Sequence, residues 1–193
     1  MKNNDLILQK LSKSYHGQVV FSDLSLALSP GNAYCLMAPS GTGKTTLFRI
    51  LMGLETPDSG TIDGLKNLKI SAVFQEDRLL EGYDVLTNLR FVCRQRLSDA
   101  ELSAYAATLL SQNALSQPVC EFSGGMKRRV AILRAILAPT DIILMDEPFT
   151  GLDADTRQLT IDLVKELCAG KLLIIATHAE DDAELLGAKI IHL

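Results

Sequence analysis

The sequence predicts an α/β fold in which helices cover the faces of a mostly parallel sheet, and three observations support this prediction. Short apolar runs of the strand type alternate with segments of helical periodicity near both ends of the chain. These runs are continuously apolar, as expected for strands that are buried on both faces. One of them, at residues 33–38, leads through a loop rich in Gly, Ser and Thr into a helical segment.

Composition limits the class of protein. The 193 residues correspond to a single domain, which we expect to span residues 1–193. With 47% hydrophobic and 22% charged residues, the chain has the balance of a soluble globular protein and not that of a disordered chain, a collagen or a coiled-coil rod. The formal net charge of −4 gives no support to a nucleic-acid partner. The longest apolar run has six residues, whereas a membrane span needs about 20.

The N-terminal segment is predicted to form β structure, because Leu24, Leu26 and Leu28 alternate with smaller side chains. The segment that starts at Lys44 has apolar side chains at helical spacing and Gly53 at the expected C-cap position. In chain order, we expect a buried strand at 33–38, a helix at 44–52, and strands at 60–63 and 68–74.

A helical block interrupts the alternation in the middle of the chain. Residues 84–115 show helical periodicity, and Pro118 ends this run. We expect the block to form a small helical lobe beside the sheet, at approximately residues 77–138. Its last helix starts at Ser123 and carries an apolar stripe made of Met126, Val130, Leu133 and Leu137.

The remainder of the chain returns to the alternation of strands and helices. Residues 141–146 and 172–176 contain apolar runs of the buried-strand type. The helix predicted between them, at 153–168, places Leu159, Leu163 and Leu167 on one face. A short acidic helix at 179–186 and a strand at 188–193 complete the predicted fold.

Residues 38–45 have the pattern of a phosphate-binding loop. The run Ala38-Pro39-Ser40-Gly41-Thr42-Gly43-Lys44-Thr45 matches G-x-x-x-x-G-K-[ST], except that Ala38 replaces the first glycine. Small residues let backbone N–H groups surround phosphates, and the N-terminus of the following helix adds the positive end of its dipole. We expect Lys44 to reach the β- and γ-phosphates and the Thr45 hydroxyl to ligate Mg²⁺. The loop alone leaves kinases, GTPases and motor ATPases open.

An acidic pair, Asp146 and Glu147, ends the apolar run at 142–145 in the manner of a Walker B strand. At the end of a buried strand, Asp146 is placed to hold the Mg²⁺ shell, and Glu147 to orient and deprotonate an attacking water. A glutamate beside the magnesium aspartate favours water over a substrate hydroxyl as the nucleophile. The pair therefore predicts hydrolysis.

A further set of motifs occurs in a defined order along the chain. The most specific is Phe122-Ser123-Gly124-Gly125-Met126, which lies 23 residues before Asp146, counting from Ser123, and resembles the LSGGQ signature of ATP-binding cassette (ABC) ATPases. Four other segments look like the adenine-stacking aromatic, Q-loop, D-loop and H-loop of this family, namely Tyr15, Phe74-Gln75-Glu76, Thr150-Gly151-Leu152-Asp153 and Ala176-Thr177-His178. The resemblance runs from about residue 5 to residue 193. It implies the P-loop NTPase fold of the ABC ATPase type, with an antiparallel β part beside the parallel sheet.

The same resemblance implies ATP and Mg²⁺ as cofactors and assigns roles to individual residues. Glu147 is the implied general base, and His178 and Lys44 complete the implied catalytic set. Thr45, Gln75 and Asp146 are the implied metal ligands. The implied ATP-binding residues are Tyr15, Pro39, Ser40, Gly41, Thr42, Gly43, Lys44, Thr45, Thr46 and Gln75.

The signature has a physical interpretation of its own. Ser123 is a good N-cap, and Gly124-Gly125 leave backbone N–H groups uncovered at a helix start, which makes a second anion site. The resemblance implies that Ser123, Gly124 and Gly125 act in trans and close over ATP on a second ABC ATPase chain, in a homodimer. Asp153 is implied to communicate across that dimer.

Several residues receive a structural interpretation only. We expect His16 and His192 to be structural and the four cysteines to be reduced thiols without a role. The run Lys127-Arg128-Arg129 is interpreted as a solvated helix face and not as a nucleic-acid patch. Two positions depart from the family, since Met126 replaces the hydrogen-bonding Gln of the signature and Ala38 replaces the first loop glycine.

The stretches after Gln75 and after Ser123 look like those of nitrate/sulfonate/taurine-type importer ATPases. This resemblance implies transmembrane permease subunits as partners, an extracytoplasmic solute-binding protein reached through the complex, and a peripheral place on the cytoplasmic face of the cell membrane. The first residues contain no apolar segment of signal-peptide length, which agrees with a cytoplasmic chain.

Three other functions stay open at this point: a soluble ABC ATPase acting outside transport, for example in DNA repair or on ribosomes; a nucleotide-dependent regulatory subunit without turnover; and a small-molecule phosphotransferase. Intact Lys44, Asp146, Glu147 and His178 speak against a subunit without turnover, and the signature does not fit a phosphotransferase. The sequence does not name the solute, and it does not decide between import and export or between a homodimer and a heterodimer.

Overall fold

The computed structural model describes residues 5–39, 41–93 and 96–193 of the chain. Its larger sheet is parallel throughout, with the spatial strand order β5-β6-β7-β3-β8. The strands in that order are β5 (Ile70–Val73), β6 (Ile142–Asp146), β7 (Leu172–Ala176), β3 (Ala33–Met37) and β8 (Lys189–His192). Neighbouring strands of such a sheet cannot follow each other directly along the chain, so helices connect them.

A second sheet is antiparallel and has the order β2-β1-β4. Its strands are β2 (Gln18–Leu28), β1 (Leu6–Tyr15) and β4 (Ser59–Asp63). Leu24 and Leu26 are half-buried and Leu28 is buried, whereas Ser25 and Ala27 between them are exposed. The alternation in the sequence therefore corresponds to a strand with one face on the core.

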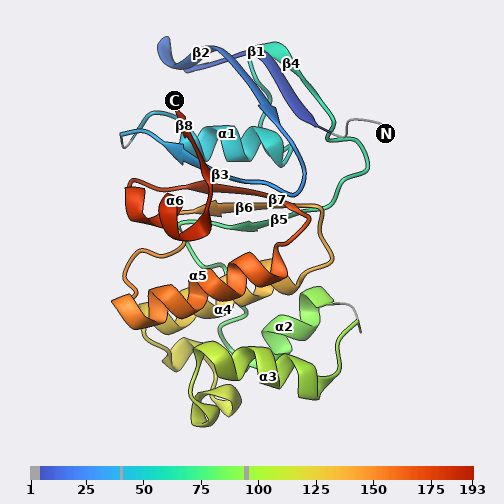
Figure 1. Ribbon diagram of the computed structural model, residues 1–193, viewed down its shortest axis with the longest axis vertical. Coiled ribbons are helices and arrows are strands. Elements are labelled where there is room, and N and C mark those ends of the chain that lie inside the picture. The colour runs from blue at the N-terminus through green and yellow to red at the C-terminus, as the bar shows by residue number, and fades with distance from the viewer. Residues whose placement is uncertain (1–4, 40, 94–95) are drawn as a thin grey trace.

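The helices lie in layers above and below the parallel sheet (Figure 1). Helix α1 (Lys44–Leu51) lies between the two sheets, and α4 (Gly124–Leu137) and α5 (Ala154–Leu167) lie on the opposite side of the parallel sheet. The lobe beyond α4 contains α2 (Val85–Cys93) and α3 (Asp99–Leu109), and α6 (Glu180–Leu186) precedes β8. Two 3₁₀ turns, η1 (Gln112–Ser116) and η2 (Val119–Glu121), lead into α4. Within the described ranges, no helix combines the length and the hydropathy that a bilayer span requires.

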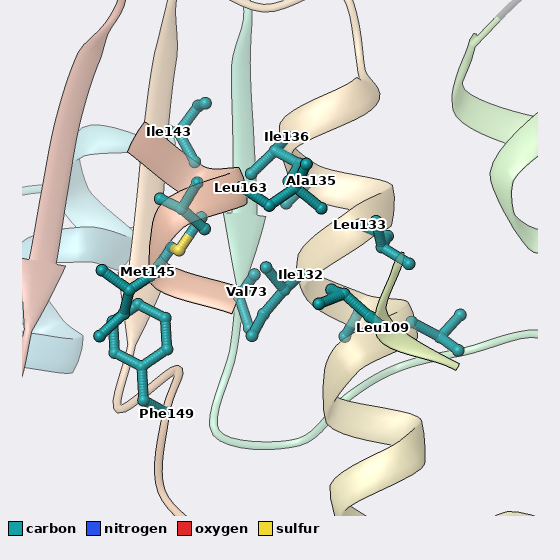
Figure 2. Close-up of a cluster of buried hydrophobic side chains, with 14 of the residues drawn as sticks. Val73, Leu109, Ile132, Leu133, Ala135, Ile136, Ile143, Met145, Phe149 and Leu163 are labelled. Carbon is teal, nitrogen blue, oxygen red and sulfur yellow. The ribbon is translucent and has the colours of Figure 1, made fainter. Parts of the chain in front are cut away.

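The parallel sheet is buried on both faces, because alternate residues of each central strand enter different clusters. In β6, Ile142 and Leu144 pack in the cluster on the α1 side, and Ile143 and Met145 pack in the cluster on the helical side. Figure 2 shows the second cluster, in which side chains of β6 meet residues of α4 such as Ile132 and Ile136. Each fully buried side chain of this size stabilises the fold by roughly 1.5–3 kcal/mol, which explains why β6 and β7 are continuously apolar.

The direction of the strands brings four chain segments to one edge. The carboxyl ends of β3, β5, β6 and β7 are followed by Ala38, Phe74, Glu147 and Thr177, respectively. In open parallel sheets ligands bind at this edge, where the chain leaves the strands. The predicted loop, acidic pair and histidine are thus brought together by strand order and direction alone.

The structure confirms the predicted fold class, including the mostly parallel sheet, the antiparallel part and the helical lobe. The helical block predicted over 84–115 is divided between two helices, since α2 ends at Cys93 and Ser98 starts α3 with a capping box to Glu101. One detail of the prediction, the position of Leu159, is wrong. Leu159 does not share the buried face of α5, since it is 57% exposed while Ile161 and Val164 are buried.

An ion pair between the partly exposed Arg157 and the buried Asp182 connects α5 with the segment after β7. Asp182, on α6, is 4% exposed and accepts hydrogen bonds from Arg157 Nε at 2.8 Å and from Thr177 Oγ1 at 2.7 Å. Thr177 Oγ1 in turn accepts a hydrogen bond from the backbone N–H of Ala179 at 3.1 Å. These contacts attach the turn that contains His178 to α5, the helix that starts just after Asp153.

We expect Asp182→Ala to lower the free energy of unfolding by about 3 kcal/mol, because removing the buried partner of the pair leaves the other charge unpaired. Urea unfolding monitored by circular dichroism measures the loss. The control is Asp162→Ala, which removes an exposed carboxylate that accepts a hydrogen bond from Gln158 on the same helix and should change stability by less than about 0.5 kcal/mol. Equal losses in the two variants would show that the Asp182 network does not stabilise the fold.

Candidate functional site

The loop between β3 and α1 is shaped by two glycines with left-handed backbone. Gly41 has φ +84° and Gly43 has φ +93°, a region that L residues with a Cβ rarely adopt. A Cβ added to Gly43 would lie 2.3 Å from Val20 Cγ1, so only glycine fits between this loop and β2. The backbone N–H and hydroxyl of Thr42 both donate to the Pro39 carbonyl, which closes the turn. Ser40, predicted as an ATP-binding residue, lies outside the described residues.

Lys44 is buried, with 9% of its surface exposed, and its ammonium group points back into the loop. Its Nζ donates to the carbonyls of Ala38 and Pro39. Gly43, the N-cap of α1, has no side chain that could accept from the first backbone N–H groups, and no acidic residue lies in the first turn. The start of α1 therefore combines a held cation with backbone donors that have no competing side-chain partner, which is the requirement for an anion site.

Thr45 and Asp146 meet although 101 residues separate them. The Thr45 hydroxyl donates to Asp146 Oδ2 at 2.6 Å, and Asp146 is 7% exposed. A cleft of about 410 Å³ surrounds this contact. It is lined by Tyr15, Val20, Gly41, Thr42, Gly43, Lys44, Thr45, Thr46, Gln75, Asp146 and Glu147.

Glu147 follows directly and has an unusual backbone, with φ +47°. The left-handed conformation destabilises a residue with a Cβ by about 1–2 kcal/mol, so its surroundings must hold it. Its N–H donates to the Ala176 carbonyl at 2.8 Å. Its carboxylate contacts His178 Nδ1 at 2.9 Å, and Thr150 Oγ1 donates to it at 3.5 Å.

The contact with Glu147 favours the protonated form of His178. The hydrogen bond to the carboxylate, followed by its negative charge, raises the pKa of His178 above the ordinary value. The imidazole is well exposed, at 73% of the side chain, whereas the Glu147 side chain is 25% exposed. A half-buried carboxylate and a histidine thus face each other at the carboxyl edge of the sheet, directly beside the cleft.

Tyr15 lies at the end of β1 and is 39% exposed toward the cleft that it lines. Lys13 Nζ lies 5.1 Å from the centroid of its ring, within the range of a cation–π interaction. The same ammonium group pairs with Glu55 and Asp58 at 3.3 Å each. A hydrogen bond with Glu55 raises the pKa of the Tyr15 hydroxyl. The aromatic ring is therefore held at the mouth of the cleft by a charged cluster.

The signature and the D-loop lie apart from the phosphate loop. Ser123 caps α4 and accepts from the backbone N–H of Met126 at 3.3 Å, and Asp153 caps α5 and accepts from that of Thr156 at 3.0 Å. The two motifs adjoin each other, since a Cβ on Gly125 would lie 3.5 Å from the Gly151 carbonyl oxygen. Gly124 of the signature and Thr150 of the D-loop line a second cavity, of about 400 Å³, together with Gln75, Glu147 and His178.

Arg128 is a residue of the site whose role the sequence interpretation missed, and Val20 lines the cleft without having been predicted there. Arg128 was expected on a solvated face, but it is 7% exposed and donates to Asp77 and to the carbonyls of Phe74, Asp146 and Glu147. The expectation is wrong for this residue because Arg128 shares its helix face with the buried Ala131, Ile132 and Ala135. Counted from Arg128, these three buried residues lie at i+3, i+4 and i+7. This helical spacing is the signal that would have placed Arg128 on the buried face of α4.

Comparisons with known proteins agree with the motifs. The family model described as ABC transporter matches residues 21–150. Nod factor export ATP-binding protein I of Cupriavidus metallidurans is 35% identical over 94% of this chain and 65% of its own length, so the chain spans less than two thirds of that relative. Taurine import ATP-binding protein TauB of Pseudomonas aeruginosa is 37% identical over 94% of this chain and 74% of its own length.

Among solved structures, a dimeric ATP-binding cassette in a post-hydrolysis state, bound to ADP and Pi, superposes with a TM-score of 0.84 at 26% identity. The match covers 97% of this chain and 94% of the solved one. The family model spans the phosphate loop, the signature and the acidic pair, that is, more than half of the chain. The chain belongs to the ABC transporter family of ATP-binding cassettes.

Proposed function

We propose that this chain is the ATP-hydrolysing subunit of an ABC transporter and that residues 1–193 act as one ATPase domain with a helical lobe at about 77–138. The observation that carries the proposal is the 2.6 Å hydrogen bond between Thr45 Oγ1 and Asp146 Oδ2. It brings the phosphate loop and the end of β6 to one point in the cleft. A hydroxyl and a carboxylate are the hard oxygen ligands that Mg²⁺ prefers.

The residues around this contact fit Mg-ATP. Thr45, Gln75 and Asp146 would hold Mg²⁺, which when bound neutralises charge on the β- and γ-phosphates. The N-terminus of α1 and Lys44 would bind the phosphates, in place of the loop carbonyls that Lys44 contacts in the structure. Tyr15, fixed by its charged cluster at the mouth of the cleft, would stack on the adenine.

Hydrolysis requires a water held beside the γ-phosphate and a group that takes its proton. Glu147 is the general base in this proposal, since its carboxylate is half-buried at the rim of the cleft. His178 would hold the same carboxylate through its Nδ1 contact and face the γ-phosphate. Lys44 would stabilise the charge that develops on the phosphate oxygens.

A second copy of the chain completes the site. Ser123, Gly124 and Gly125 leave N–H groups at the start of α4, but among the described residues none of the three lines the Lys44 cleft. They would therefore close over ATP bound to a partner chain, and Asp153, next to them in space, would contact that partner. The dimeric assembly of the related cassette bound to ADP and Pi supports this arrangement.

Transport requires subunits that this chain does not contain. Membership of the ABC transporter family supports permease subunits as partners, an extracytoplasmic solute-binding protein within the complex, and a place on the cytoplasmic face of the membrane. The relatives include an importer ATPase for taurine and an export ATP-binding protein for Nod factor. We propose import, because the segments after Gln75 and Ser123 resemble importer ATPases.

The transport assignment predicts a membrane partner. When the tagged chain is purified from gently solubilised native membranes, mass spectrometry should identify a multi-span permease in stoichiometric amount. A Lys44→Ala chain expressed at the same level serves as a control that removes nucleotide binding without changing the outer surface. Recovery of ribosomal or DNA-associated partners without any membrane protein would contradict transport and leave the ATPase chemistry standing.

Glu147→Gln should lower the turnover of Mg-ATP by roughly 10²–10⁴-fold, the usual contribution of a general base, while ATP affinity is retained. Since hydrolysis no longer separates the chains, the variant should also accumulate as an ATP-bound dimer in light scattering. Glu166→Gln, which changes an exposed glutamate on α5, is the matched control and should behave as wild type. A Glu147→Gln protein that stays monomeric in saturating Mg-ATP would count against the two-chain site.

The pair of Glu147 and His178 predicts a pH effect. The hydrogen bond and charge of Glu147 raise the pKa of His178, so Glu147→Gln should lower it toward the ordinary value of 6.5. A raised native pKa means that the pair stabilises the folded state fully at pH below 6.5 and that this contribution is lost as the pH rises through the native pKa.

NMR titration of the imidazole signals measures both proteins. Asp155→Asn, which removes an exposed carboxylate on α5, should leave the titration of His178 as in wild type. The same pKa for His178 with and without the Glu147 carboxylate would show that the pair does not form in solution.

A further inference from the structure

Arg128 is a nearly buried cation in the first turns of α4, with only 8% of its side chain exposed. Its guanidinium donates to four acceptors on two chain segments. On one side it contacts the Phe74 carbonyl and, at 3.0 Å, the Asp77 carboxylate. On the other side Nη2 donates to the carbonyls of Asp146 and Glu147 at 2.8 Å each.

These two segments are the ones that flank the reacting phosphate in the proposed function. Gln75, a proposed metal ligand, lies between Phe74 and Asp77. Asp146 and Glu147 are the second metal ligand and the general base. A planar guanidinium with five fixed donors can hold both segments at once, whereas the ammonium of a lysine offers a single charged point. The contacts therefore set the distance between the Gln75 segment and the end of β6.

Arg128 contacts the backbone carbonyl of Glu147, and this backbone has the left-handed conformation that a residue with a Cβ rarely adopts. With φ at +47°, Glu147 and the preceding residue direct consecutive carbonyls toward one nitrogen of Arg128. The N–H of Glu147 donates to the Ala176 carbonyl of β7 at 2.8 Å, and the Glu147 carbonyl also accepts from the Thr150 N–H at 3.4 Å. Arg128 supplies the shorter of the two contacts to the Glu147 carbonyl, so loss of Arg128 leaves the left-handed turn freer to relax.

We infer that Arg128 is a positioning residue, which orients Glu147 for proton abstraction and joins it to the segment that carries Gln75. The inference rests on the proposed function for the identity of the general base. Arg128 lies one turn after Gly124 on α4. It connects α4 to Glu147 of the same chain, while the start of α4 would contact ATP bound to the partner chain. Arg128 thus links the orientation of Glu147, the general base of its own chain, to the position of the signature that would contact ATP on the partner chain.

Arg134 provides a matched control on the same helix. Its guanidinium donates to the carbonyls of Arg78 at 2.9 Å and Asp77 at 3.1 Å, but no contact with β6 is present in the described structure. Loss of this side chain therefore loosens the segment after Gln75 without touching Glu147. Arg134→Met removes the same charge and the same kind of donors as Arg128→Met.

Arg128→Met should lower kcat for Mg-ATP by about 10- to 100-fold, because a shift of the order of 1 Å in a catalytic group lowers rates by about that much. The affinity for Mg-ATP should change by less than about twofold, since none of the four acceptors is a phosphate-binding group. Arg128→Lys should recover part of the lost kcat, and it keeps a cation beside Asp77 if Arg128→Met proves unstable. Arg134→Met should keep both constants within about twofold of wild type.

A double-variant comparison tests whether Arg128 acts through Glu147. In a Glu147→Gln background, Arg128→Met should cause little further loss of turnover, because the group it positions is already inactive. A further loss of the same factor as in wild type would overturn the inference, as would a loss of affinity at unchanged kcat.

Hydrogen–deuterium exchange of the chain without nucleotide gives a readout that does not depend on activity. Arg128→Met should speed exchange in peptides covering residues 74–78 and 146–150, whereas Arg134→Met should speed it only in the first. Unchanged exchange at 146–150 would overturn the inference. If Glu147→Gln itself hydrolyses ATP as fast as wild type, the assignment of Glu147 as the general base fails, and the exchange data alone still decide whether Arg128 holds the Glu147 turn.

Discussion

Parallel pairing of buried strands is the constraint on which the whole site depends. β6 and β7 are covered on both faces, and every residue of the two strands is buried, so they form the centre of the parallel sheet. Their shared direction brings the carboxyl ends of β3, β5, β6 and β7 to one edge. The phosphate loop, Gln75, Asp146 and His178 therefore meet although they are far apart in sequence. The chemistry of the site is a consequence of packing in the core beneath it.

At that edge the charged groups are held by partners that differ in kind. Lys44 is held by loop carbonyls, Asp146 by the Thr45 hydroxyl, and Glu147 through both its side chain and its backbone. The left-handed backbone of Glu147 is the least favourable of these local conformations. Arg128 donates to the Glu147 carbonyl, and the Glu147 N–H donates to the Ala176 carbonyl. The strained backbone of Glu147 thus connects its own carboxylate, the proposed general base, to β7 of the sheet and, through Arg128, to α4, the helix that begins at the signature.

Much of this arrangement could be predicted, and the failures have identifiable causes. The apolar runs predicted the buried strands because a strand covered on both faces has no polar residues to obscure the pattern. The apolar spacing predicts a helical lobe over 84–115 but not how it divides into helices, since Ser98 and Glu101 cap α3 locally. Leu159 was placed on the wrong face because a helix bears several apolar stripes, and tertiary contacts decide which of them is buried. Arg128 was misread because charged residues are usually exposed.

The sequence alone determines the order of elements, the loop that suits phosphate and the carboxylates placed after a buried strand, because these depend on local pattern and on residues adjacent in the chain. Only the tertiary structure decides which distant groups meet. The contact of Thr45 with Asp146, the pairing of Glu147 with His178 and the four acceptors of Arg128 each join segments from different strands or helices. No local pattern encodes such contacts, since they arise from strand order in the sheet and from the burial of a cation whose partners are mostly backbone carbonyls.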